Sequence, residues 1–241
     1  MPEQLPFLSV IIPVYNAERH LAAAIKSIQD QQYPALEILA IDDGSSDKSA
    51  EILRSFPEVT YTYQTNQGPA AARNRGIQQA KGEFILFLDA DDYFPAGKIQ
   101  QQLAYFERDP TLEAVVGKSQ FIFEEDAQTD EFRFPDETHQ VFNVLVGSGI
   151  YRRSVFEKIG LFDEGLRFSE DFDWFNRIRE KEVAMLLTDD ITLFYRRHNT
   201  NMTRDTDSMR VNALLMIKRS LDRRRQEGEM RELPKFSELK A

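Results

Sequence analysis

Three aspartates crowd the end of an apolar run in the segment FILFLDADDYF, residues 84 to 94. Asp89, Asp91 and Asp92 follow the run FILFL, which predicts a strand that is buried on both faces. Like charges this close repel one another and raise each other's pKa unless a cation lies among them. Hard divalent ions prefer carboxylate oxygens, so the Asp89-Ala90-Asp91 spacing indicates a site for Mg²⁺ or Mn²⁺.

The orientation of these acids follows from the predicted strand. Side chains alternate along a strand, so Asp89 and Asp91 would point to the same side. One of them would then reach a metal-bound water while the other binds the metal. A structural interpretation competes with this one, because aspartates also form and cap turns. Asp92, just before Pro95, is the candidate for that structural role.

Composition limits what the whole chain can do. It has 241 residues, of which 41% are hydrophobic and 29% charged, which predicts one large globular domain with a small appended element. The formal charge of −10 argues against nucleic-acid binding, because phosphate neutralisation needs a basic face. The absence of cysteine excludes disulfides and thiolate-metal sites. No apolar run approaches the roughly 20 residues of a membrane span, and the first residues lack signal-peptide features, so we expect a cytoplasmic location.

The first hundred residues alternate short β-rich runs with amphipathic stretches. The predicted strands are 8–15, 36–41, 59–64 and 84–88, and the predicted helices between them are 18–31, 47–56 and 69–82. This alternation implies a Rossmann-like, mostly parallel α/β sheet with helices on both faces. Ligands bind beyond the carboxyl ends of such strands, where Tyr15, the Asp42-Asp43 pair and the acids at 89 to 92 all fall.

The second half of the chain is less regular. We expect a strand within 113–126, and another within 142–156 that opens into a helix ending at Gly160. A helix at 169–182, strands at 183–189 and 191–198, and a closing helix at 205–226 follow. The acidic stretch 124–140, broken by Pro135, predicts an exposed loop. The side chains expected to face inward from the closing helix are Met209, Ala213, Met216, Ile217 and Leu221.

Four segments together resemble a known family. SVIIPVYNAERHL, AIDDGSSDKS, NQGPAAARNRGIQQAKGEFILFLDADD and SEDFDWF occur in the order and approximate spacing of the family 2 glycosyltransferases, over roughly residues 7 to 200. The resemblance implies the GT-A fold and inverting sugar transfer from a nucleotide-diphospho-sugar. The expected organisation is a GT-A domain at 1–204, with a nucleotide-binding half at 7–118 and a smaller acceptor-binding half at 119–204, then a C-terminal helix and tail at 205–241.

On the nucleotide side, the resemblance makes Asp43 the partner of a uracil N–H edge, and UDP the expected nucleotide. The start of the third helix, with Gly68 and Arg73, suits diphosphate charge. Arg73 could instead pair with Asp91 or Asp92 and relieve their repulsion. Tyr15 could equally belong to the core, and Asp42 to a strand-to-helix turn. The residues predicted to bind the nucleotide-sugar are Pro13, Val14, Tyr15, Asp42, Asp43, Gly68, Arg73, Asp89 and Ala90.

On the acceptor side, the resemblance implies that Asp171 is the general base and that Glu170 orients it or the acceptor. The dipole at a helix start lowers a carboxylate pKa, so burial by neighbours such as Phe172 and Trp174 would be needed to restore basicity. Trp174 is either a platform for a sugar ring or a core residue. His198 is a candidate third metal ligand after Asp91 and Asp89, or else a solvent-facing loop residue.

The expected partners are a nucleotide-diphospho-sugar donor and a saccharide or lipid-linked acceptor in cell-surface polysaccharide synthesis. The locally basic segment KRSLDRRRQEGEMREL suits peripheral contact with the inner membrane face, although it also suits a solvated helix end.

Two other classes of protein share part of the pattern. A phosphatase of the haloacid dehalogenase type also carries a DxD motif, but on its first strand. A non-catalytic nucleotide-sugar-binding relative is the other alternative, and such a protein would lose the base or the metal carboxylates.

Overall fold

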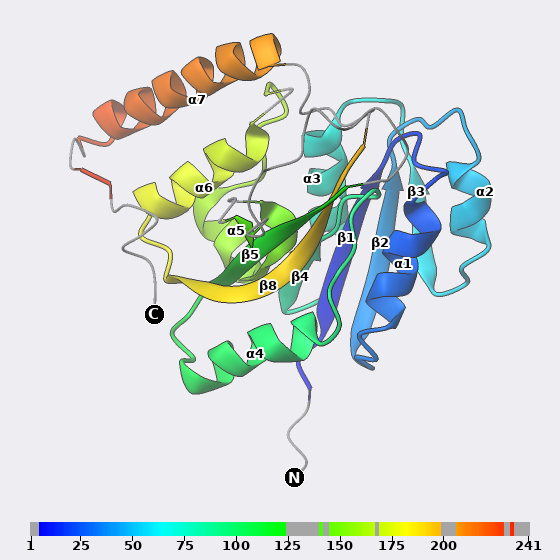
Figure 1. Cartoon of the computed structure of the whole chain (residues 1–241). Coiled ribbons are helices and arrows are strands. Elements are labelled where there is room, and N and C mark those ends of the chain that lie inside the picture. Colours follow the sequence, from blue (N-terminus) through cyan, green and yellow to red (C-terminus); the bar gives the residue numbers. More distant parts are fainter. Residues whose placement is uncertain are drawn as a thin grey trace.

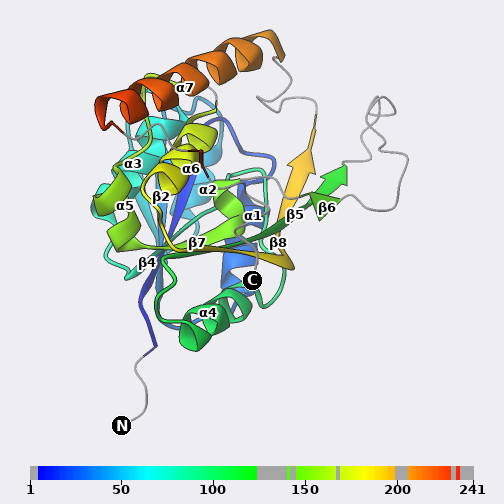
Figure 2. The same ribbon diagram turned by 90° about the vertical axis from the view of Figure 1, so that its left-hand side faces the viewer.

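The computed structural model describes residues 5–123, 140–141, 145–166, 169–198, 206–228 and 232–233. Its centre is a sheet with the strand order β3-β2-β1-β4-β7-β5-β6, and β8 pairs with β5 on the edge opposite β7 and β6. Figure 1 shows β1 to β5 and β8, and Figure 2 also shows β6 and β7. Most of the exposed loop predicted at 124–140 lies outside the described residues.

The first four strands form a parallel sheet, as predicted. The strands are β1 (Leu8–Val14), β2 (Leu36–Asp42), β3 (Val59–Tyr63) and β4 (Phe84–Phe87). The helices between them are α1 (Leu21–Gln29), α2 (Ser49–Arg54) and α3 (Pro69–Gln79). Because β4 already ends at Phe87, the acids at 89 to 92 lie beyond the strand rather than in it.

The second half adds antiparallel strands and a second parallel pair. Its elements are α4 (Lys98–Arg108), β5 (Ala114–Phe123), β6 (Gln140–Val141), a 3₁₀ turn (Val146–Ser148), β7 (Gly149–Arg152), α5 (Arg153–Ile159), α6 (Glu170–Glu180), β8 (Met185–Arg197) and α7 (Thr206–Gln226). β7 lies antiparallel between β4 and β5, whereas β8 runs parallel to β5. The sheet is therefore continuous through residue 118, and the division of the chain into two halves remains a prediction.

Two expectations for this half were wrong. The stretches 183–189 and 191–198 form one strand, β8, because register shifts against β5 near Lys118 absorb the irregular residues between them. Helix α4 was not predicted at all, although Ile99, Leu103 and Phe106 are spaced as one buried helix face.

Alternation along the strands divides the core into two layers (Figure 2). Val10, Ile12 and Leu86 face one side, where α1, α2 and α4 cover the sheet. Ile11 and Phe87 face the other side, where α3, α5 and α6 pack. At Gly76 of α3 an added Cβ would lie 2.4 Å from Ile11 Cγ2, so glycine allows this helix to approach β1 closely.

Helix α7 lies along α6 through charged contacts (Figure 1). Arg223 pairs with Asp173 at 2.9 Å and with Glu180 at 2.8 Å, and Arg219 pairs with Asp163. The prediction that Ile217 faces inward was wrong, since that side chain is 51% exposed. None of the helices in the described part of the chain is long and apolar enough to cross a membrane.

Candidate functional site

The acids after β4 form a turn. The Asp92 amide donates to the Asp89 carbonyl at 3.0 Å, which closes the turn over residues 89 to 92. Within it, Asp89 and Asp91 keep partly exposed side chains, whereas Asp92 is buried. Asp89 and Asp91 have different partners, Arg73 and His198 respectively, so the expected same-side arrangement of an extended strand does not apply.

Strand β8 holds this turn in place from a distant part of the chain. The Arg196 amide donates to Asp92 Oδ1 at 2.8 Å, and Arg196 Nε donates to the Asp91 carbonyl at 2.9 Å. Tyr93 and Phe194 exchange two backbone hydrogen bonds. Burial, followed by the charges of Asp91 and Asp89, raises the pKa of Asp92 well above its ordinary value. Asp92 therefore has the structural role considered for it, because it anchors the turn to β8.

Asp91 and His198 are the pair best placed to hold a metal. His198 Nε2 lies 2.9 Å from Asp91 Oδ2, and the Asp91 side chain is 31% exposed. Within the described ranges, no three histidine, aspartate or glutamate side chains are grouped so as to enclose an ion. A carboxylate and an imidazole without further protein ligands fit Mn²⁺ or Mg²⁺, ions that commonly complete their shell with waters and substrate phosphates.

Arg73 links the turn to helix α6. Its two terminal nitrogens lie 2.6 Å from Asp89 Oδ1 and 2.6 Å from Glu170 Oε1. Burial disfavours the charge of Arg73, but the two carboxylates outweigh burial and raise its pKa above the ordinary value. Arg73 thus relieves the repulsion among the acids, as the structural interpretation held, but its partners are Asp89 and Glu170 rather than Asp91 or Asp92.

Asp171 follows at the start of α6. Its surface is partly accessible, but surrounding protein and then the charge of Glu170 raise its pKa to about 7. The positive charge of Arg73 and the Phe172 amide, which donates to Asp171 Oδ1 at 2.8 Å, act in the opposite direction. Desolvation therefore raises the pKa of Asp171 by more than the helix start lowers it. A carboxylate with this pKa can accept a proton near neutral pH.

Ser169, the residue that precedes α6, lies in the left-handed region at φ 65°, which is uncommon for a non-glycine residue.

The burial of Trp174 in α6 shows its role. This side chain is fully buried among the rings of Tyr151, Phe156 and Phe162. Trp174 is therefore a core residue and not a sugar platform. Phe172 is exposed, so it is not the neighbour that buries Asp171.

Asp42 and Asp43 end β2 but face different partners. Asp42 Oδ1 accepts from the Ser45 amide and Oδ2 from the Tyr61 hydroxyl, which supports its reading as a turn residue. Asp43 accepts from Gln64, from the Gln67 amide and, through Oδ2, from the Gly68 amide at 2.8 Å. A carboxylate offers about four acceptor positions, so Asp43 keeps room for one further donor.

The loop after β1 is joined to the loop after β2. The Asn16 amide donates to Ser45 Oγ, and the Ser46 amide donates to Asn16 Oδ1. Pro13 and Val14 are buried in β1, whereas the Tyr15 side chain is 56% exposed and is therefore not a core residue. An exposed ring at a fixed strand end is available to contact a planar ligand.

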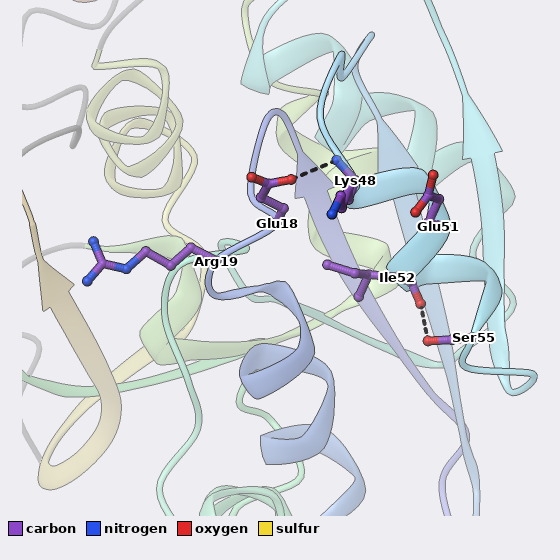
Figure 3. Close-up of a pocket in the computed structure, with 6 residues that line it drawn as sticks. All are labelled: Glu18, Arg19, Lys48, Glu51, Ile52 and Ser55. Atoms are coloured by element: carbon purple, nitrogen blue, oxygen red, sulfur yellow. Dashed lines mark hydrogen bonds between the residues drawn. The ribbon is translucent and has the colours of Figure 1, made fainter.

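An open pocket of about 620 Å³ lies beside these loops (Figure 3). The lining side chains are Glu18, Arg19, Lys48, Glu51, Ile52 and Ser55. Glu18 accepts a hydrogen bond from the Lys48 amide, which adds to the links between the two loops. None of the residues predicted to bind the nucleotide-sugar or the metal, or to act in catalysis, lines this pocket.

One residue of the site had no signal in the sequence. His20, at the start of α1, packs its ring 5.1 Å from that of His198. The two histidines are far apart in the chain, so only the fold brings them together.

Two solved structures share the fold of this chain. TarS of S. aureus in complex with UDP-GlcNAc matches with a TM-score of 0.63 and 21% identity, over 86% of this chain and 66% of that one. The mannosyltransferase PcManGT of Pyrobaculum calidifontis, in complex with GDP-Man and Mn²⁺, matches with a TM-score of 0.66 and 19% identity, over 97% of this chain and 67% of that one. These matches confirm the predicted GT-A fold.

This chain spans only part of the length of its sequence relatives. An uncharacterized glycosyltransferase of Rickettsia typhi is 31% identical over 192 residues, which cover 74% of this chain and 60% of the relative. The minor teichoic acid biosynthesis protein GgaA of Bacillus subtilis is 32% identical over 209 residues, which cover 78% of this chain and 47% of the relative. The family model described as glycosyl transferase family 2 matches residues 9–160, more than half of the chain. The chain therefore belongs to glycosyl transferase family 2.

Proposed function

We propose that this chain is an inverting glycosyltransferase that moves a sugar from a nucleotide-diphospho-sugar to a hydroxyl group of an acceptor, with Asp171 as general base. The observation that carries the proposal is the Asp171 carboxyl, whose pKa is raised to about 7 beside the Arg73 bridge between Asp89 and Glu170. The site thus brings together a group that can accept a proton near neutral pH and acidic side chains from separate segments of the chain.

In the proposed reaction, the acceptor oxygen attacks the anomeric carbon of the donor as the bond from that carbon to the diphosphate oxygen breaks. Asp171 takes the proton of the attacking hydroxyl, and the electron pair of the broken bond stays on the nucleoside diphosphate. Attack from the face opposite the leaving group inverts the anomeric centre. Glu170, held by Arg73, orients the base or the acceptor.

The departing diphosphate gathers negative charge at the turn after β4. Asp91 and His198 would hold the cation, with Asp89 beside them, and a bound Mn²⁺ or Mg²⁺ would supply Lewis-acid stabilisation of that charge. The amino end of α3 after Gly68 presents a positive dipole to the same charge. Both terminal nitrogens of Arg73 contact carboxylates, so Arg73 would act on the diphosphate mainly through its field.

We propose UDP as the nucleotide, with the uracil N–H edge on Asp43 and the ring against Tyr15 and its neighbours Pro13 and Val14. Calorimetric titration of UDP, GDP and TDP, each with and without Mn²⁺, tests this choice. UDP should bind most tightly and Mn²⁺ should strengthen its binding. Stronger binding of GDP would contradict the uracil assignment, and failure of all three nucleotides to bind would contradict the proposed function.

The acceptor is proposed to be a saccharide or lipid-linked saccharide of a cell-surface polymer. The similarity to GgaA, whose name assigns it to teichoic acid biosynthesis, supports this class. The peripheral membrane contact remains a prediction, and it has less charge available than the sequence suggested, because Arg219 and Arg223 pair with acids of the domain.

Replacing the base separates catalysis from binding. Asp171→Asn should lower kcat by roughly 10² to 10⁴-fold, because the side chain keeps its size but loses its proton affinity. UDP affinity should stay nearly unchanged, as should the activity of the control variant Asp109→Asn, an exposed acid after α4. A large loss of UDP affinity in Asp171→Asn would show that the base has been misassigned. Normal turnover by this variant would show that Asp171 is not the general base.

A further inference from the structure

The His20 side chain lies between the proposed nucleotide loop and the proposed metal pair. It is 8% exposed, and its ring is tilted by 37° against the ring of His198, with a centroid distance of 5.1 Å. His198 in turn lies 2.9 Å from Asp91. Three segments therefore meet through side chains at this point: the start of α1, the end of β8 and the turn after β4.

We propose that His20 is a positioning residue whose aromatic ring backs His198 and fixes its orientation toward Asp91. This inference rests on the proposed function, because it concerns the cation that Asp91 and His198 would hold. His20 itself is not assigned as a metal ligand.

The need for such support follows from the position of His198. Strand β8 ends at Arg197, so within the described residues His198 lies just beyond the paired part of the strand. A metal ligand binds best when its ring is already oriented, since otherwise metal binding must bear the entropy of ordering it. Two rings at centroid distances of about 4.5 to 7 Å are within the range of favourable aromatic packing.

His20 also connects Asp91 and His198 to the loop that is proposed to bind the nucleotide. Its amide donates to the Ala17 carbonyl at 3.0 Å, and the neighbouring Asn16 is joined to Ser45 in the loop after β2. A nucleotide that orders this loop would therefore also order the ring behind His198. The inference predicts that nucleotide and metal each strengthen the binding of the other, and that His20 transmits part of this coupling.

The test measures Mn²⁺ binding directly by electron paramagnetic resonance, with and without UDP, in the full chain. His20→Ala should weaken Mn²⁺ affinity by about tenfold, the lower end of the effect of losing an outer-shell contact. His20→Phe, which keeps an aromatic ring, should bind Mn²⁺ within about twofold of the unmodified chain. Neither substitution should change the affinity for UDP measured without metal.

A double substitution tests the pathway. If His20 acts through His198, His198→Ala and the combined His20→Ala/His198→Ala variant should bind Mn²⁺ equally weakly. His20→Leu fills the buried space without an aromatic ring, and should reproduce the weakening if His20→Ala does not fold.

The outcomes separate this inference from the proposed function. If the unmodified chain binds UDP and Mn²⁺ but His20→Ala and His20→Leu bind Mn²⁺ equally well, the role of His20 is refuted and the proposed function stands. A Phe variant as weak as the Ala variant would refute ring packing as the cause. If the unmodified chain binds neither ligand, the proposed function itself fails.

Discussion

Arg73 joins two acids that belong to opposite sides of the proposed reaction. Asp89 lies in the turn that follows β4, whereas Glu170 precedes the proposed base in α6. Arg73 is buried, so its charge is costly unless both acids remain paired with it. The same charge lowers the pKa of Asp171 against the effect of burial. One guanidinium therefore affects both the stability of the fold and the pKa of the proposed base.

We expect Arg73→Met to lower the free energy of unfolding by about 3 kcal/mol, because it leaves buried Glu170 without its cation. It should also raise the pKa of Asp171, since the nearby positive charge is lost. Asp171 must be ionised to act as base, so kcat/KM falls as pH drops below about 7 in the unmodified chain. In the variant, this fall should begin at a higher pH.

Urea unfolding and pH–rate profiles measure the two effects. Arg75→Met, a partly exposed position two residues along α3, is the matched control and should change stability by less than about 0.5 kcal/mol. An unchanged acid limb in Arg73→Met would contradict the electrostatic role of Arg73, even if the variant were less stable.

Single residues were predictable from the sequence where a local pattern specifies them. The helix predicted at 169–182 placed Glu170 and Asp171 in its first turn, and the structure has them there. Contacts across the fold were not predictable, because they depend on tertiary packing: the pairing of Arg73 with Glu170 and the contact of His20 with His198 are examples. The strand predicted at 84–88 is within one residue of β4, but the same-side orientation expected for Asp89 and Asp91 was wrong, because these residues fold into a turn that FILFLDADD does not mark.

At the scale of elements, α6 carries the proposed base on one side and the docking site of α7 on the other. Asp173 accepts from Arg177 within α6 and from Arg223 of α7. Glu180 accepts from Arg223 and from the Ser220 hydroxyl. Among the described side chains of α7, Arg223 and Ser220 therefore dock the helix on α6 through hydrogen bonds to buried carboxylates.

We expect Arg223→Met to release α7 while the sheet stays folded, because Asp173 and Glu180 lose a shared cation in a site that is nearly closed to water. Amide hydrogen exchange along α7 should rise by at least about tenfold, the change expected from a loss of roughly 1.4 kcal/mol of local stability. Arg225→Met is the control, since Arg225 is exposed and lies 3.8 Å from Asp222. Equal exchange in both variants would show that the pairs do not dock α7.

The elements with clear periodicity were the predictable ones. The first four strands and α7 were placed within one or two residues of their observed ends. Helix α4 was missed because the segment after Pro95 was dominated by the turn signals of Pro95 and Gly97, although Gly97 in fact precedes the helix in a left-handed conformation. β8 appeared as two strands because its irregular middle is compensated by the partner strand, which a single sequence does not contain.

At the scale of the whole molecule, one buried lysine couples stability to pH. Lys98 is fully buried, its Nζ donates to Gln102 Oε1 at 2.5 Å and lies 4.7 Å from the Phe94 ring centroid. Gln102 donates onward to the Val115 and Ser148 carbonyls, so the group ties α4 to the sheet. Burial lowers the pKa of Lys98 to about 7.

The sign of the pH effect follows from this shift. Between about pH 7 and 10, the unfolded chain keeps a proton on Lys98 that the folded chain has released, so stability rises with pH. The slope from this one group reaches at most about 1.4 kcal/mol per pH unit, and the stability gained is lost as pH falls through about 7. Lys98→Met should remove this contribution and flatten the dependence.

Urea midpoints at pH 7, 8 and 9 measure the difference between the two proteins, because contributions from other groups are common to both. Lys26→Met, an exposed position on α1, should leave the slope unchanged. Parallel pH curves for Lys98→Met and the unmodified chain would mean that Lys98 titrates normally.

The bridge between Tyr93 and Phe194 also has a consequence for the newly made polypeptide. Strands β1 to β4 pair with one another within the first 87 residues, so these contacts can form before β8 is translated. The acidic turn has to wait for β8, which is translated about a hundred residues later. The side that is proposed to bind the nucleotide would therefore fold first, and the arrival of β8 would complete the turn that is proposed to hold the cation.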